Sequence, residues 1–404
     1  MSDAFLDSLS SDTGSIDDSE PRAPAWMAVF SLAMGVFGLL TAEYLPASLL
    51  TPMSAGLGVS EALAGQAVTV TAVVAMFSGL LTASLTRRID RRIVLFVFSL
   101  LMIASNLLAA LSSSLIVLLA MRVLLGIALG GFWSMAAAVA MRLVPAILLP
   151  RALSIIFSGI SVATVVAVPL GSYLGGLYGW RSAFFAAAAL GVLTLAFQFF
   201  ALPPLKPTRP ARLGTILEIL RRPGIGAGML CCTLVHTGQY ALFTYIRPVL
   251  ESVMVINVSG LALILLAFGV ANFVGTLVAG WMLERSLRAT LVVMPVLIGG
   301  ASLDLILLPA GITGQVLLVV LWGVAFGGVP VAWSNWVAHA VPDQAESAGG
   351  MVVVSVQSAI AAGAAVGGLM FSIGGVVGVF GVASAILLFS ALLIVFRVRT
   401  NVSL

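Results

Sequence analysis

The sequence predicts an all-α integral membrane protein with twelve transmembrane helices in two six-helix pseudo-repeats. Three observations predict this fold class. The 404 residues are 61% hydrophobic and only 8% charged, whereas a soluble domain carries roughly a quarter charged residues. We count twelve apolar runs, each long enough, at about 20 residues, to cross a bilayer. Residues of the first half recur 197 positions later, as Gly126 does in Gly323 and Arg88 in Arg285.

The twelve apolar runs divide evenly around a basic, proline-containing segment. Their centres lie near Phe37, Val74, Leu101, Ala128, Val165, Leu193, Cys232, Gly269, Leu297, Ala325, Ala359 and Leu387. We expect four parts: a disordered cytoplasmic tail (1–22), an N-terminal six-helix half (23–203), a cytoplasmic middle loop (204–224) with a short surface helix over Leu213–Leu220, and a C-terminal half (225–399). Two similar halves with a cavity between them are the structural basis of alternating-access transport.

Glycines repeat at helix spacing in both halves. Gly126 and Gly130 match Gly323 and Gly327, and each pair forms a small-x3-small pattern. Such patterns let helix backbones approach closely. We therefore expect tight helix crossings here, with a direct role in gating as the alternative.

The basic residues predict the orientation. They concentrate before the first helix, after the second, fourth and eighth helices, in the middle loop and at the end of the chain, while the other face has only Arg181 and Arg247. By the positive-inside rule, both termini and the middle loop are cytoplasmic. The net charge of +4 then follows from topology and does not indicate a nucleic-acid partner. Because residues 1–22 are acidic and lack the basic start of a signal peptide, we expect the first helix to insert uncleaved.

Several short motifs are typical of one transporter family. The connection after the second helix carries Arg88, Asp90 and Arg91, and the corresponding connection in the second half carries Glu284, Arg285 and Arg288. Other motifs are Arg122-x3-Gly126, Pro169-Leu170-Gly171 and Glu43-Tyr44-Leu45-Pro46. With these motifs the chain resembles the major facilitator superfamily over nearly its whole length, and in particular its drug- and sugar-efflux branch. The resemblance implies that the two charged connections gate the transporter by locking one half against the other. Plain positive-inside charge is the alternative.

Longer stretches indicate the cargo. They include Leu124 to Trp133 (LLGIALGGFW), Phe243 to Pro248 (FTYIRP), Gly65 to Phe77 and Asp343 to Glu346. These stretches are similar to bacterial family members that export purine ribonucleosides. This resemblance implies antiport of inosine, adenosine and guanosine against protons, in the bacterial inner membrane, by a monomer. Efflux of an arabinose-like sugar or of drugs is the alternative.

Charged residues inside apolar helices are costly in lipid and usually functional. Glu43 and Arg122 lie inside helices at similar depth, in the outer half of the bilayer, and Asp304 is the third such residue. A carboxyl group in a low-dielectric cavity holds a proton more readily than one in water. We expect Glu43 to take up the coupling proton beside Arg122, with a static ion pair as the alternative. Asp304 falls in a helix that is peripheral in the family, and we expect it to face the outer headgroups.

Aromatic and amide side chains are the candidate substrate contacts. Trp322, Trp333 and Trp336 fall within roughly 40° of one helix face. A wide aromatic surface with hydrogen-bonding groups suits a flat base attached to a sugar, although tryptophans also anchor helices at membrane interfaces, which fits Trp336 best. The full set of expected substrate-binding residues is Trp133, Gln239, Tyr240, Trp322, Trp333, Asn335 and Gln357. His236 shares a helix face with Tyr240, and a structural role is the simpler interpretation for it.

Few residues could support enzymatic chemistry. The only lysine, Lys206, is followed by proline, so the chain has no P-loop for ATP hydrolysis. Two histidines and the adjacent Cys231 and Cys232 offer too few ligands for a catalytic zinc site. We therefore expect no cofactor and no enzyme. An exporter ranks first, an importer of the same fold second and a membrane enzyme third.

Overall fold

The computed structural model describes residues 24–206, 218, 220–254, 256–307, 311–341 and 345–398. The regular structure in these ranges is helical throughout. In chain order the helices are α2 (Trp26–Ser48), α3 (Leu50–Leu57), α4 (Glu61–Ala64), α5 (Gln66–Leu85), α6 (Arg91–Ala110), α7 (Leu115–Leu143), η1 (Ala146–Leu148), α8 (Leu149–Val162), η2 (Ala163–Ala167), α9 (Val168–Leu177), α10 (Trp180–Ala201), α12 (Ile225–Thr244), α13 (Ile246–Val253), α14 (Val258–Leu283), α15 (Leu287–Leu307), α16 (Ile312–Ala340) and α17 (Ala345–Arg397). The predicted tail (1–22), Asp343 and most of the predicted helix Leu213–Leu220 lie outside the described residues.

Ten helices of the described part are long and apolar enough to cross a membrane. The last of them covers 48 residues, Gly350–Arg397, and contains two helices joined at Gly375, whose φ of 56° lies outside the helical region. Helix α12 adds a further 20 residues without Asp, Glu, Lys or Arg. Counting α12 and the two parts of α17 separately gives the twelve crossings that the sequence predicts.

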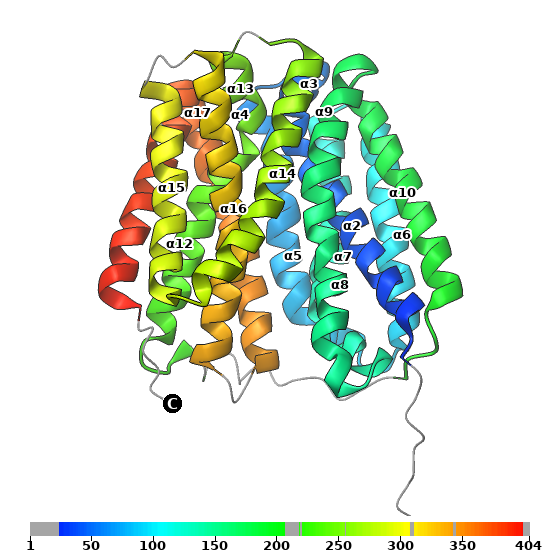
Figure 1. Cartoon of the computed structure of the whole chain (residues 1–404). Helices are drawn as coiled ribbons and strands as arrows, with labels where there is room; N and C mark the ends of the chain where they lie inside the picture. The colour runs from blue at the N-terminus through cyan, green and yellow to red at the C-terminus, as the bar shows by residue number, and fades with distance from the viewer. Residues whose placement is uncertain are drawn as a thin grey trace, which may run out of the picture.

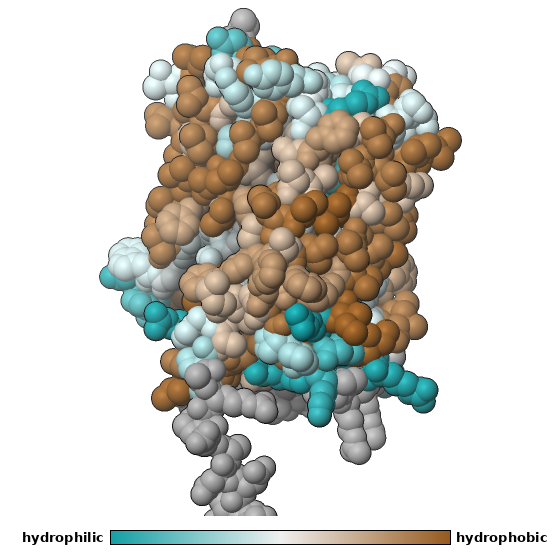
Figure 2. Space-filling model, turned by 90° about the vertical axis from the view of Figure 1, so that its right-hand side faces the viewer, coloured by the Kyte–Doolittle hydropathy of each residue, from teal (hydrophilic) through white to brown (hydrophobic). Residues whose placement is uncertain are grey.

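The helices run side by side in one bundle, with the start of α2 and the end of α17 at its lower end (Figure 1). A broad hydrophobic band covers the face of the bundle that Figure 2 shows, and hydrophilic residues gather at its lower end. Many large apolar side chains of the described helices are exposed, including Phe200 at 86% and Ile116 at 80%. An apolar belt of this kind suits contact with lipid chains.

The internal repeat is visible in the helix crossings. A Cβ atom at Gly126 of α7 would lie 2.6 Å from the carbonyl oxygen of Thr71 in α5, and one at Gly323 of α16 would lie 2.7 Å from that of Phe268 in α14. The two pairs correspond at the 197-residue offset, because Gly126 matches Gly323 and Thr71 matches Phe268. The glycines therefore permit the same close backbone contact in each half, as the small-x3-small patterns predict.

Two helices are broken at corresponding points. The first crossing is divided at Leu49 into α2 and α3, and the seventh is divided at Tyr245 into α12 and α13. The breaks are within one residue of the 197-residue offset. We call α2–α10 the N half and α12–α17 the C half. The halves meet where α5 packs on α17, where α9 and η2 pack on α14, and where α2 meets α12 and α13.

Candidate functional site

The strongest candidate site surrounds Glu43, which lies in α2 and is only 6% exposed. Arg122 of α7 is fully buried and donates from Nη2 to the carbonyl oxygen of Ala42 at 2.8 Å and from Nε to Thr71 Oγ1 at 3.2 Å. Because Ala42 precedes Glu43, the acid and the guanidinium lie at the same depth. Arg122 and Gln357 of α17 are both close enough to interact electrostatically with the Glu43 carboxyl group.

The polar groups of this site are incompletely satisfied. Glu43 Oε1, Arg122 Nη1 and Gln357 Nε2 are all buried without a hydrogen-bond partner among the described residues. Glu43 and Arg122 form no ion pair with each other in this part of the chain, so the static ion pair considered above is not formed here. A buried polar atom without a partner costs roughly 1–3 kcal/mol. The site therefore has free donors and acceptors that a proton, a water or a substrate group can satisfy.

A small cavity of about 10 Å³ adjoins the Glu43 side chain, which is close to the space that one water molecule requires. Side chains of both halves line it, including Glu43, Tyr44 and Val68 from the N half and Tyr240 and Thr244 from the C half. The Tyr44 and Tyr240 side chains are close enough to interact with each other and with Glu43. An acid and two phenols thus meet at the boundary between the halves.

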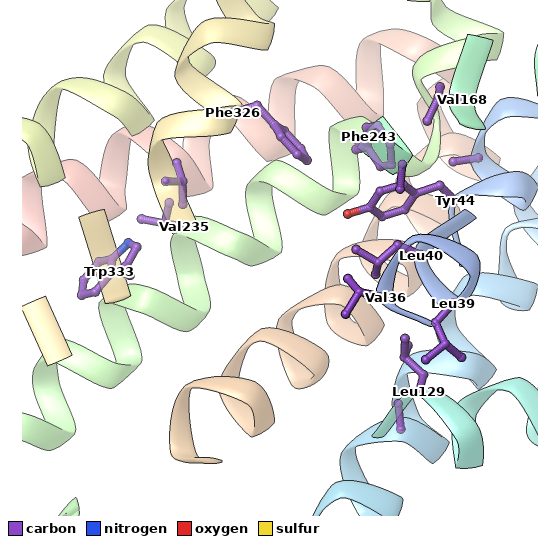
Figure 3. Close-up of a cluster of buried hydrophobic side chains, with 14 of the residues drawn as sticks. Val36, Leu39, Leu40, Tyr44, Leu129, Val168, Val235, Phe243, Phe326 and Trp333 are labelled. Atoms are coloured by element: carbon purple, nitrogen blue, oxygen red, sulfur yellow. The ribbon is translucent and has the colours of Figure 1, made fainter. Parts of the chain in front are cut away.

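Aromatic rings extend from this cavity into the C half. Tyr44 makes an edge contact with Phe243 at 5.3 Å between ring centroids, and Tyr240 contacts Phe243 at 6.2 Å and Phe326 at 5.9 Å. Figure 3 shows Tyr44 beside Phe243, while Trp333 lies near Val235 and well away from Tyr44. The aromatic residues beside Glu43 are therefore two tyrosines and a phenylalanine, of which only Tyr240 was predicted from the sequence to contact the substrate.

The three tryptophans of α16 pack inside the C half. Trp322 is fully buried between Phe268 and Phe380, and its Nε1 atom has no hydrogen-bond partner among the described residues. Trp333 is 1% exposed and makes an edge contact with Trp336 at 5.5 Å. Neither lines the cavity beside Glu43, so the two do not form one open aromatic surface in this arrangement, and their substrate contacts stay a prediction.

The remaining predicted contacts are spread over several helices. Gln239 donates from Nε2 to the Phe326 carbonyl oxygen at 3.3 Å, while its Oε1 has no hydrogen-bond partner in the described ranges. Trp133 is half-buried against Phe157, and Asn335 is half-buried on α16. Within the described ranges, no three His, Cys, Asp or Glu side chains come together as metal ligands.

Two other polar residues of the helices have simpler surroundings. His236 donates from Nδ1 to the Cys232 carbonyl oxygen of its own helix at 2.8 Å, which suits a structural role. Asp304 is half-buried near the end of α15, in the C half. Neither residue belongs to the lining of the cavity beside Glu43.

The predicted gating residues bond within their own halves or to the start of the middle loop. Asp90 accepts from the backbone of Arg92 and Leu205, and Arg91 donates to Thr86. In the C half, Arg288 donates to the Val395 carbonyl oxygen and Arg285 lies over the Trp281 ring. The structure places Arg88 and Glu284 at the same helix ends. Across the described part of this end, none of these six residues forms a hydrogen bond or ion pair from one half to the other, so a locking role stays a prediction for another conformation.

Polar contacts between the halves occur instead at the opposite end, around the breaks of α2 and α12. Arg247 donates to the Ser48 carbonyl oxygen at 2.9 Å, and Thr51 donates to Glu251 at 2.6 Å. The sequence argument did not select these residues. Arg247 is nevertheless an arginine on the face that is otherwise poor in basic residues, which is a signal that could have found it.

Comparison with known proteins agrees with this architecture. The family model described as Major Facilitator Superfamily matches residues 32–364. Proteins named purine ribonucleoside efflux pump NepI, from Salmonella enteritidis and from Salmonella typhi, are each 44% identical to this chain over 376 residues, covering 93% of this chain and 95% of theirs.

Two crystal structures share the fold. A D-xylose-proton symporter superposes with a TM-score of 0.74 at 17% identity, covering 93% of this chain and 98% of the symporter. A bacterial homologue of the human lysosomal transporter Spinster, in an inward-facing and unoccupied conformation, superposes with a TM-score of 0.70 at 16% identity, covering 92% and 95%. The family match over residues 32–364 and the 44% identity to the efflux pumps establish that this membrane transporter belongs to the Major Facilitator Superfamily.

Proposed function

We propose that this transporter exports purine ribonucleosides, such as inosine, adenosine and guanosine, in exchange for protons. The 44% identity to proteins named purine ribonucleoside efflux pump, over 93% of the chain, supports the cargo. The burial of Glu43 beside Arg122, with no ion pair between them among the described residues, is the observation that carries the coupling to protons. We propose no enzymatic activity and no cofactor.

Glu43 is the proposed proton carrier. A carboxylate buried without a counter-ion is far more costly than a neutral carboxyl group, so the arrangement around Glu43 suits the protonated form. When Glu43 loses its proton, Arg122 Nη1, which has no partner among the described residues, can donate a hydrogen bond to the carboxylate. Two unit charges about 4 Å apart attract by roughly 4 kcal/mol at an effective dielectric constant of about 20. This attraction is large enough to favour a different arrangement of α2 and α7.

The nucleoside is proposed to bind between the halves, at the cavity beside Glu43. Tyr44, Tyr240 and Phe243 offer ring faces and edges for a base, and Gln357 offers an amide for ribose hydroxyls or the purine edge. The cavity has room for about one water, so the halves must move apart to admit a nucleoside. We retain Trp133, Gln239, Trp322, Trp333 and Asn335 as proposed contacts in such an opened arrangement.

The orientation follows from the basic residues, which we propose to be cytoplasmic. The lower end of Figure 1 then faces the cytoplasm of a bacterial inner membrane, and the α3 and α13 end faces outside. The domain boundaries at 203/204 and 224/225 and the monomeric state are part of the same proposal. A reporter fused after Leu404 should read cytoplasmic, and one inserted near Gly56 should read outside.

Inside-out vesicles test the cargo directly. Vesicles that contain the protein receive labelled inosine, labelled arabinose and a lipophilic cation in parallel, with and without a proton gradient. We expect gradient-driven accumulation of inosine alone. Accumulation of arabinose or of the cation in place of inosine would assign sugar or drug efflux instead.

The Glu43→Gln variant tests the coupling. The glutamine keeps the shape of the protonated acid, so we expect gradient-driven accumulation to be lost while nucleoside binding stays measurable. Asp304→Asn is a matched control, because Asp304 lies in peripheral α15 and does not line the cavity. Normal gradient-driven transport by Glu43→Gln would remove this residue as the carrier.

A further inference from the structure

A second polar cluster bridges the two halves around the break between α2 and α3. Helix α2 ends at Ser48, and the last carbonyl groups of a helix lack partners inside it. Arg247 of α13, in the C half, donates from Nη1 to the Ser48 carbonyl oxygen at 2.9 Å and to Ser172 Oγ of α9 at 3.4 Å. A cation is also favoured at a helix C-terminus by the helix dipole. An arginine of one half thus caps a broken helix of the other.

Glu251 completes the cluster from the same face of α13. Its Oε1 accepts from Arg247 Nε at 2.8 Å, and its Oε2 accepts from the Thr51 hydroxyl of α3 at 2.6 Å. Arg247 and Glu251, four residues apart, therefore present one donor and one acceptor to the two sides of the break at Leu49. Arg247 is 4% exposed, so its bonds to Ser48 and Ser172 are largely shielded from water, whereas the Glu251 side chain is 29% exposed.

We propose that Arg247, Glu251 and Thr51 form the outer gate of the transporter, in which Arg247 and Glu251 of the C half bind the N half and hold the α3 and α13 end closed. This proposal rests on alternating access and on the proposed orientation, but not on the identity of the cargo. Opening this end breaks the bonds to Ser48, Ser172 and Thr51 together, because all three partners belong to the other half.

The gate is reversible because water replaces its bonds on opening. Because water can take the place of each partner, a hydrogen bond to a charged group shifts the equilibrium between the closed and open ends by roughly 10-fold or more. A bond between neutral groups shifts it less. Arg247 also keeps its bond to Glu251 within α13 in either state. We therefore expect the loss of Arg247 to raise the ratio of open to closed outer ends by roughly 10-fold or more.

The distance between two labels at the outer end measures this ratio directly. Ala55 of α3 and Ser259 of α14 are both exposed and lie in opposite halves at this end. Spin labels on Ala55→Cys and Ser259→Cys are read by pulsed electron resonance in the full-length protein in lipid nanodiscs, without nucleoside. The native Cys231 and Cys232 are buried, so they do not compete for the label.

Three variants are compared in the labelled protein. Arg247→Gln should move the distance distribution to longer values, and Thr51→Val, which removes only the hydroxyl bond to Glu251, should move it less in the same direction. Arg181→Gln is the matched control, because Arg181 lies at the same end but donates to Ser112 within the N half. It should leave the distribution unchanged.

The proposed gate would be contradicted if Arg247→Gln and Thr51→Val both keep the distance distribution of the parent protein. It would also be contradicted if Arg181→Gln opens this end as much as Arg247→Gln does. Thr51→Val is a small change on a half-buried residue, so it still tests the gate should Arg247→Gln fail to fold. Failure of inosine transport in vesicles, with the expected label distances, would remove the proposed cargo and leave the gate in place.

Discussion

The repeated helix crossings allow a stability prediction in which a single methyl group has opposite effects at two glycines. At Gly126, a Cβ atom would lie 2.6 Å from the Thr71 carbonyl oxygen, about 0.8 Å short of the 3.4 Å at which ordinary contact begins. The blocking atom belongs to the backbone of α5, so no side-chain rotation can relieve the overlap. Gly126→Ala must therefore push α5 and α7 apart.

The expected magnitude follows from this geometry. A gap of roughly 0.5–1 Å already forfeits a quarter to a half of the attraction between facing atoms, and overpacking a core by one carbon typically costs about 1–3 kcal/mol. Alanine in place of glycine stabilises a helix by about 1 kcal/mol. We expect Gly126→Ala to lower the free energy of unfolding by up to about 2 kcal/mol. Gly323→Ala should do the same, because its contact with Phe268 is the repeat equivalent at 2.7 Å.

Gly300→Ala is the matched control. Gly300 lies inside α15 and a Cβ atom there would meet nothing within 4 Å, so we expect this variant to be as stable as the parent or more stable by up to about 1 kcal/mol. The free energy of unfolding is measured by titrating mixed micelles with a denaturing detergent and following tryptophan fluorescence. If Gly126→Ala proves no less stable than Gly300→Ala, the close crossing is not as described.

Three further substitutions separate coupling, cargo and packing. Arg122→Met should abolish gradient-driven transport yet leave the protein folded, because a protonated Glu43 leaves no charge buried alone when the guanidinium is removed, and the cost is limited to the lost bonds to Ala42 and Thr71; unfolding of this variant in a thermal assay would contradict this. Tyr240→Phe keeps its ring contacts but loses its hydroxyl, so inosine affinity in equilibrium binding should fall by about 2–10-fold, and unchanged affinity would exclude a bond from this hydroxyl to the cargo. Trp333→Ala should destabilise the protein by about 3–5 kcal/mol, because Trp333 is 1% exposed, whereas Trp281 is 57% exposed and Trp281→Ala should change stability little. At matched expression, Trp333→Ala should also impair inosine transport more than Trp281→Ala does. Equal transport and stability of the two variants would contradict both the burial and the predicted cargo contact.

Membrane insertion explains why the helices were predictable from the sequence. In lipid, each crossing segment must satisfy its own backbone hydrogen bonds, so an apolar run of about 20 residues is sufficient to predict a helix. The details within crossings were less predictable. The break at Tyr245 lies three residues before Pro248, and the π-helical turn over Ala163–Ala167 lies just before Pro169. Each proline removes a helix hydrogen bond, but hydropathy carries no signal for the form that the break takes.

The candidate site was predictable in part. Glu43 and Arg122 stood out because charge is rare in apolar helices, and their similar depth followed from counting residues along each helix. Tyr44 was not selected, since a tyrosine in an apolar helix is ordinary until a neighbour from the other half is known. Trp322 and Trp333 share a face of α16, but a shared face does not tell whether that face meets a cavity or other helices.

The sequence by itself determined the fold class, the repeat and the two buried charges, because hydropathy, the 197-residue offset and the cost of charge in lipid are all properties of the chain read in order. Only the tertiary structure decided the partners of those residues. Arg122 bonds to Ala42 and Thr71, and its Nη1 has no partner among the residues that the structure describes. Arg247 bonds across to Ser48, 199 positions away in the chain. Hydrogen bonds act over about 3 Å, so contacts between distant segments depend on how the two halves are packed together, which no local pattern specifies.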